Sequence, residues 1–167
     1  GKINMKKIFA ITLLFTFITV NLFAVNYYVD QHHKNASDIT ADSQGLSWAK
    51  PFKSPTYAYE QTDDNRGDSI HIAQGVYKFK NNVDYEITLN KINVEWIGYG
   101  EVWFEGKGAT NSFQNNLFSY TTTNNIVRLT NIKVRNFSTV FNWLGTTQAH
   151  EFGRIQGCEF FNNASVI

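Results

Sequence analysis

The sequence predicts an all-β protein, a solenoid in which short strands stack as the coils of a parallel β-helix. The stretch GDSIHIAQGVYKF at residues 67–79 holds two apolar bursts that are too short for helices and that a glycine joins without a hairpin turn. An order of strand, bend, strand, longer loop and third strand then recurs, in cycles that begin at Trp96, Leu129 and Ile155. Repeats of about 20 to 50 residues are typical of solenoids, and the rest of a coil is the long connection that parallel strands need.

The first segment has the features of a secretory signal peptide. Lys6 and Lys7 form a short basic start, residues 8–20 are apolar apart from threonine, and Ala24 offers a small residue for cleavage. Residues 8–20 are fewer than the roughly 20 that cross a bilayer, although an uncleaved anchor is the alternative interpretation. We therefore expect residues 1–24 to be a signal peptide with an upstream extension. The product would be secreted or held at the cell surface, with no membrane span after cleavage.

The composition and the charge of the chain limit which kinds of partner it can bind. The chain of 167 residues is 43% hydrophobic and 17% charged, which is typical of a globular domain. Without the three lysines of the leader, 12 Lys and Arg face 14 Asp and Glu, and no basic stripe for nucleic acid remains. The single cysteine, Cys158, excludes an intramolecular disulfide framework.

Residues 25–66 are expected to form the entry to the fold. A short strand over residues 26–30 precedes a polar loop, and Ser54 with Pro55 is a strong signal for the start of a helix. The helix would cover residues 55–61 and would be the only one in the mature chain. The oxygen-rich segment 63–68 lacks the spacing of a calcium loop, so no metal site is predicted there.

Residues 67–167 are expected to form the first coils of the β-helix, and the chain would end inside a coil. Alternation along each strand sorts the residues into core and surface. The predicted inward residues are Val102, Phe104, Ile132, Val134, Cys158 and Phe160. The predicted outward columns are Trp103, Lys133 and Glu159 on one strand position and Glu95, Arg128 and Arg154 on the position before it. Bends are expected at Gly75, Gly98 and Gly157 and at Asn131, Asn136 and Asn162.

An antiparallel β-sandwich is the alternative fold. It needs hairpin signals between neighbouring strands, and GYGE at residues 98–101 is one candidate. The recurrence of the same strand, bend and strand order favours the solenoid.

Two stretches resemble the amino-terminal entry of exported bacterial right-handed parallel β-helix proteins of the pectin-lyase-like superfamily. GLSWAKPF at residues 45–52 is similar to the pattern G-x-S-W-x-x-P-F that leads into their capping helix. GDSIHIAQGVY at residues 67–77 is similar to G-D-x-I-x-x-x-x-G-x-Y, which opens their first coil. SPTYAYEQ departs from the more apolar helix of that family. The resemblance implies right-handed coils and a helix that plugs the amino-terminal end of the cylinder and hides unpaired strand edges.

The resemblance also implies a polysaccharide partner, because many such proteins act on or bind acidic polysaccharides along the outer face of their coils. The charged residues expected to bind an anionic sugar are Glu95, Arg128, Arg154, Lys133 and Arg135, with Trp103 as a surface for a sugar ring. Ordinary solvated strand charges are the alternative interpretation of this patch.

Two functions stay open at this point. The first is a polysaccharide lyase or glycoside hydrolase whose active site lies beyond Ile167, and no catalytic residue of this chain is predicted. No cofactor is evident in the chain, although relatives often hold Ca²⁺ and the full-length protein could do so. The second is a non-catalytic surface or adhesion protein. In either case we expect the full-length protein to be a monomer.

Overall fold

The structure is a computed structural model that describes residues 23–63, 66–79, 87–91, 93–107, 116–120, 126–143 and 151–166. Of the predicted leader at residues 1–24, residues 1–22 lie outside the described residues. The described chain is an all-β protein with one short helix and two parallel sheets. The larger sheet contains β1 (Asn26–Val29), β2 (Ser69–Lys78), β4 (Glu95–Glu105), β6 (Ile126–Thr130), β7 (Lys133–Arg135), β9 (Glu151–Gln156) and β10 (Glu159–Phe161). The smaller sheet contains β3 (Ile87–Leu89), β5 (Asn116–Tyr120) and β8 (Thr139–Trp143).

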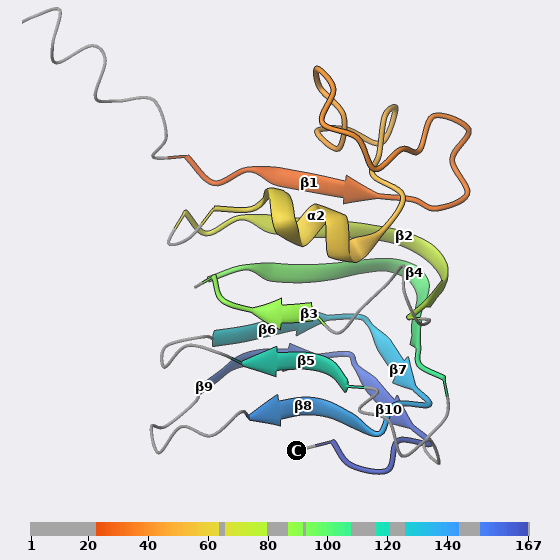
Figure 1. Cartoon of the computed structure of the whole chain (residues 1–167), viewed down its shortest axis with the longest axis vertical. Coiled ribbons are helices and arrows are strands. Elements are labelled where there is room, and N and C mark those ends of the chain that lie inside the picture. The colour runs from red at the N-terminus through yellow and green to blue at the C-terminus, as the bar shows by residue number, and fades with distance from the viewer. Residues whose placement is uncertain are drawn as a thin grey trace, which may run out of the picture.

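The strands stack in parallel from one end of the molecule to the other (Figure 1). The larger sheet runs in the order β1-β2-β4-β6-β9, with β7 between β4 and β10, and the smaller sheet runs β3-β5-β8. Every strand pair among the described residues is parallel. The antiparallel sandwich is therefore wrong for this part of the chain, and the prediction of parallel strands is confirmed.

The register agrees with the predicted repeat. Trp96 pairs with Leu129, and Leu129 pairs with Ile155, so the three predicted starts of a cycle lie side by side. Ile70 of β2 precedes them in the same column, opposite Trp96. Because successive residues of a strand point to opposite faces, this register fixes which side chains enter the core.

The core lies between the two sheets and is rich in aromatic side chains. The rings of Trp96 and Phe118 are 5.6 Å apart, and Phe118 stacks on Phe141 at 5.7 Å. Of the predicted inward residues, Val102, Phe104, Ile132 and Val134 are fully buried. Cys158 and Phe160, from the last strands, are only partly buried.

Asparagines make the bends between strands, as predicted. Asn131, Asn136 and Asn162 have φ values of 55°, 62° and 51°, a left-handed conformation that asparagine tolerates better than most residues. Asn162 also donates from its amide to the amide oxygen of Asn136 at 2.7 Å, so these two bends are joined.

The predicted bend at Gly98 is wrong. Gly98 lies inside β4, where an added Cβ would collide with the carbonyl oxygen of Asn131. Glycine is needed here for close approach of two backbones, and the strand bends further on. Between the pairs Ala73–Tyr99 and Gly75–Val102, β4 has one residue more than β2, which makes a β-bulge.

The helix α2 (Pro55–Gln61) has the predicted bounds. The Ser54 hydroxyl accepts from the backbone N–H of Tyr57 at 3.2 Å, and Pro55 occupies the first helical position. In Figure 1 α2 lies above β3, next to the free edge of the smaller sheet. Tyr59 confirms this contact, because its hydroxyl accepts from the backbone N–H groups of Asn90 and Lys91, directly after β3.

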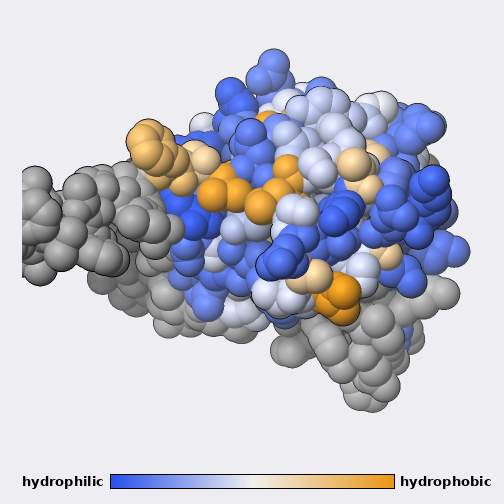
Figure 2. All heavy atoms as spheres, turned by 90° about the horizontal axis from the view of Figure 1, so that it is seen from above, coloured by the Kyte–Doolittle hydropathy of each residue, from blue (hydrophilic) through white to orange (hydrophobic). Residues whose placement is uncertain are grey.

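The free edge of β1 is covered by the loop that follows it and not by the helix. Tyr28 donates its N–H to Gly45 at 2.8 Å, and Phe52 donates its N–H to Tyr28 at 2.8 Å. Val29 and Phe52 form an isolated parallel bridge. Seen from this end, the surface is mostly hydrophilic with small, separate hydrophobic spots (Figure 2).

Candidate functional site

The structure divides the predicted sugar-binding residues between two places on the larger sheet. Glu95, Arg128 and Arg154 are direct neighbours on β4, β6 and β9, as the predicted column requires. Arg154 forms an ion pair with Glu95. Arg128 instead donates to the side-chain oxygen of Asn93 at 3.1 Å.

The other predicted residues lie after the bend, where Trp103 pairs with Lys133 and Lys133 pairs with Glu159. The cations of β7 approach the Trp103 ring, with Lys133 Nζ 5.2 Å and Arg135 Cζ 4.6 Å from its centroid. Arg135 also donates from Nε to Glu105 Oε1 at 2.9 Å, and its Nη2 forms an ion pair with the same oxygen at 2.8 Å. The predicted outward column is thus confirmed in position.

The charges of this second group balance each other. Lys133 Nζ is 3.4 Å from carboxylate oxygens of both Glu101 and Glu159. Hydrogen bonds from Trp103 and Lys133 lower the pKa of Glu101, which keeps that carboxylate ionised. Three cations therefore face three carboxylates: Lys78, Lys133 and Arg135 against Glu101, Glu105 and Glu159. Such exposed, neutralised pairs attract an anionic polymer only weakly.

A cluster of aromatic side chains on the outer face of β1, β2 and β4 was not predicted. Tyr28, His71 and Tyr99 come from these three strands, and Trp48 comes from the loop that covers β1. Tyr28 stacks on His71 with ring centroids 5.1 Å apart. Trp48 contacts Tyr28 at 4.8 Å and Tyr99 at 5.6 Å, both edge to face. We call these four residues the aromatic cluster.

A chain of hydrogen bonds holds the aromatic cluster. The Ser69 hydroxyl donates to the side-chain oxygen of Asn26 at 2.7 Å, so it accepts from Nε2–H of His71 at 3.0 Å. The other ring nitrogen, Nδ1, then accepts from the Tyr99 hydroxyl at 2.8 Å. Partial burial lowers the pKa of His71, although the carboxylate of Glu95 opposes this effect, so the ring is neutral at pH 7.

The aromatic cluster is exposed although it is held in place. Trp48 is 39% and Tyr99 is 47% exposed. The turn that carries Trp48 is closed by the backbone hydrogen bond from Gly45 to Lys50, at 2.7 Å. Large rings that are already ordered lose little conformational entropy when a ligand covers them. Sequence reasoning missed the cluster because its members come from distant parts of the chain; the aromatic residues at the outward positions 28 and 99 were the available signal.

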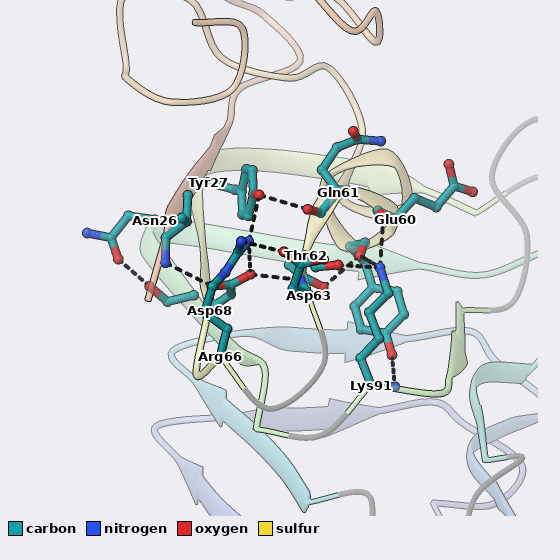
Figure 3. Close-up of polar contacts among 12 residues, drawn as sticks. Asn26, Tyr27, Glu60, Gln61, Thr62, Asp63, Arg66, Asp68 and Lys91 are labelled. Atoms are coloured by element: carbon teal, nitrogen blue, oxygen red, sulfur yellow. Dashed lines mark hydrogen bonds and ion pairs between the residues drawn. The ribbon is translucent and has the colours of Figure 1, made fainter. Parts of the chain in front are cut away.

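A pocket of about 320 Å³ lies between α2 and β3. Its lining residues are Thr56, Tyr59, Glu60, Ile87, Thr88, Asn90 and Lys91. Lys91 closes the end of the helix, because its ammonium group donates to the carbonyl oxygens of Tyr59, Glu60 and Thr62 at 2.6 to 2.8 Å (Figure 3). Burial lowers the pKa of Lys91. The ammonium donates to three backbone carbonyls, which marks it as part of the scaffold.

The described residues contain no group of three or more His, Cys, Asp or Glu that could hold a metal ion. Within the same part of the chain, no helix is long and apolar enough to cross a membrane. Comparison of the chain with models of protein families, with curated proteins and with solved structures finds no match.

Proposed function

We propose that this chain is an exported, right-handed parallel β-helix protein of the pectin-lyase-like type that binds extracellular polysaccharide on the outer face of its larger sheet. The recurrent parallel register supports the β-helix, because equivalent strands of successive cycles pair with each other although other strands lie between them in the sequence. The helix and loop that cover the sheet edges at the first strands support the capped entry.

The observation that carries the binding function is the aromatic cluster. Sugar rings present C–H groups on their faces and hydroxyl groups at their rims. Exposed aromatic rings can stack on the C–H faces of a sugar, and hydroxyl and amide groups such as those of Ser69 and Asn26 can form hydrogen bonds with its hydroxyl groups. The cluster contains no charged side chain, and its histidine is neutral. A neutral polysaccharide is therefore the ligand class that fits it best.

Acidic polysaccharide at the column of Glu95, Arg128 and Arg154 is the second candidate. The specific observation in its favour is that, within the described part of the chain, Arg128 donates to the side-chain oxygen of Asn93 and forms no ion pair with a carboxylate. An anion held there would contact two arginines that are adjacent in the register. Lyase or hydrolase activity on the same polymer, and non-catalytic adhesion, are both compatible with either ligand.

The deciding experiment is affinity electrophoresis of the purified chain in gels that contain galactomannan, xyloglucan, pectate, alginate or chondroitin sulfate. We expect retardation by a neutral polymer that persists in about 0.5 M NaCl, because stacking is not screened by salt. Trp48→Ala and Tyr99→Ala should each weaken binding about tenfold or more, as for a residue at the centre of a binding surface. Trp103→Ala is the matched control and should leave neutral binding unchanged.

Other outcomes separate the alternatives. Binding to acidic polymers alone, abolished by salt and by Arg128→Ala, would replace the first candidate by the second. Release of products absorbing as unsaturated uronates would identify a lyase. Absence of retardation in every gel would contradict the polysaccharide function itself.

A further inference from the structure

The carboxylate of Asp68 is the centre of a buried polar network where β1 begins. Asp68 is completely buried. It accepts from Arg66 Nε and Nη2, both at 2.6 Å, and from the backbone N–H of Asp63 at 2.9 Å. Figure 3 shows Arg66 and Asp68 pointing toward each other below Tyr27, whose hydroxyl accepts from Arg66 at 3.1 Å.

The fourth donor to Asp68 is the backbone nitrogen of Val25, at 2.8 Å from Oδ1. The fold holds Val25 on both sides, because its carbonyl oxygen also accepts from Ser69 N–H at 3.0 Å. The two described residues before it, Phe23 and Ala24, are exposed. The bond between Ala24 and Val25 is also the cleavage point that the sequence predicts.

We propose that Asp68 binds the α-ammonium group of a mature amino terminus at Val25. The inference rests on the export in the proposed function. Signal-peptidase hydrolysis breaks the Ala24–Val25 amide bond with one water, which leaves a carboxylate on Ala24 and an amine on Val25. This amine takes a proton at neutral pH, since an α-amino group has a pKa of about 7.7 to 8.0. The ammonium forms where the amide N–H already donates to Asp68.

The charges of the network favour this exchange. Among the described residues, Asp63 and Asp68 form ion pairs with Arg66 alone, and the more distant Lys91 ammonium, which donates to backbone carbonyls, acts on both carboxylates only through its field. An ammonium at Val25 balances the second carboxylate and replaces a neutral hydrogen bond with a charge-assisted one. The amine is only partly withdrawn from water, because Val25 is half-buried, so the desolvation that weakens fully buried ion pairs is limited.

The proposed ion pair requires cleavage at one particular bond, and a shift of the cleavage site by a single residue in either direction would remove it. A terminus at Ala24 would leave an uncharged amide at Val25 and put the ammonium at an exposed residue. A terminus at Asn26 would remove the donor to Asp68 altogether. The mature chain that starts at Val25 is thus the one whose charged end reaches the buried carboxylate.

The test compares two forms of the otherwise whole mature chain, one that begins at Val25 and one that begins at Ala24, each released from a removable fusion. Thermal unfolding is followed at low micromolar concentration from pH 6 to pH 10. We expect the Val25 form to melt about 3 °C higher at pH 6.5. Because the ion pair raises the folded-state pKa of the amine, this advantage should be full below the unfolded pKa and disappear as the pH rises through the folded pKa.

Acetylation of the Val25 amine is the matched control, because it restores a neutral amide and leaves Asp68 and its other donors intact. The acetylated form should melt like the Ala24 form at every pH. Mass spectrometry of the exported protein should find Val25 as its first residue. Equal melting of the Val25 and Ala24 forms, or a mature terminus elsewhere, would overturn the inference. Failure of the chain to bind any polysaccharide would leave it unaffected, because neither measurement depends on a ligand.

Discussion

The two ends of the strand stack differ in how their edges are covered. At the first end, the loop around Gly45 and Phe52 bonds to β1, and α2 lies over β3. At the other end of the described strands, inward side chains are less well buried: Ile155 is 39% exposed and Phe160 is only partly buried, although their register partners Leu129 and Val134 are 0% exposed. Burial of a residue in the stack thus depends on the layers on both sides of it.

One column of side chains shows this dependence directly. Trp96, Leu129 and Ile155 are successive partners in the register of the larger sheet. The exposed fraction is 1% for Trp96 and 0% for Leu129, but 39% for Ile155. The three positions are equivalent in the strand order, and among the described strands β9 has a neighbour on one side only, which accounts for the exposure of Ile155.

Replacement of Asp68 should have the largest effect, at the covered end. Asp68→Ala leaves the Arg66 guanidinium, 9% exposed, without its buried partner, and we expect a loss of about 3 to 5 kcal/mol in the free energy of unfolding. Asp63→Asn is the control, because that side chain is 64% exposed, and it should change stability by less than about 1 kcal/mol. Urea unfolding measures both variants. Similar losses from the two substitutions would show that burial does not set the strength of this network.

The same network predicts how stability changes with pH. Burial opposes ionisation of Asp68, but hydrogen bonds from Arg66 and from the backbone of Val25 and Asp63 outweigh it and lower the pKa. A lowered carboxyl pKa stabilises the fold at neutral pH, and the contribution is lost as the pH falls through the folded pKa, below 3.8. The Asp68→Ala variant should therefore lose less stability than the parent protein between pH 5 and strongly acidic conditions.

A pair of truncations in one column tests the effect of the covering layer. Leu129→Ala should lower the free energy of unfolding by about 2 to 5 kcal/mol, because it opens a cavity in the core. Ile155→Ala should cost about 1 kcal/mol or less, because the side chain is already in contact with water. Equal losses would mean that the last layer is as well packed as the one before it.

Replacement of Phe161 should have the smallest effect on stability, but a measurable effect on self-association. Among the described strands β10 pairs only with β7. In the isolated chain such an edge strand can pair with another chain, and a charge on it opposes this. Phe161→Glu should reduce the apparent mass in light scattering at high protein concentration without a change in melting temperature. Ile39→Glu, at a residue of the loop before α2 that is 55% exposed against 66% for Phe161, should leave association unchanged. If both variants lowered the apparent mass, association would depend on exposed hydrophobic surface in general and not on the edge strand.

Sequence reasoning succeeded where the signal is local. Ser54 and Pro55 set the start of α2, and the alternation of apolar residues placed Trp103, Lys133 and Glu159 in one column. Both signals act over a few residues, through helix capping and the two-residue period of a strand.

The remaining features depend on residues that are distant in the sequence. Lys91 closes a helix that ends well before it in the chain, and Asp68 bonds to the backbone of Val25, which precedes the whole entry loop. Nothing near Lys91 distinguishes it from a surface lysine. The bend assigned to Gly98 failed for the same reason, because the backbone of Asn131 requires that glycine. The candidate site divides in the same way: its charged columns follow from strand alternation, and the aromatic cluster forms only when a loop meets three strands.

The parallel register also determines how the chain can fold. Neighbours in the column from Ile70 to Ile155 are separated in the sequence by the remainder of a cycle, so no strand can find its partner through a tight turn. Each layer requires closure of a loop of that length before any contact compensates for the lost entropy. Because the strand pairing is non-local, we expect folding to take about milliseconds to seconds. The end covered by the loop and α2 would form first, and later layers would be added to it.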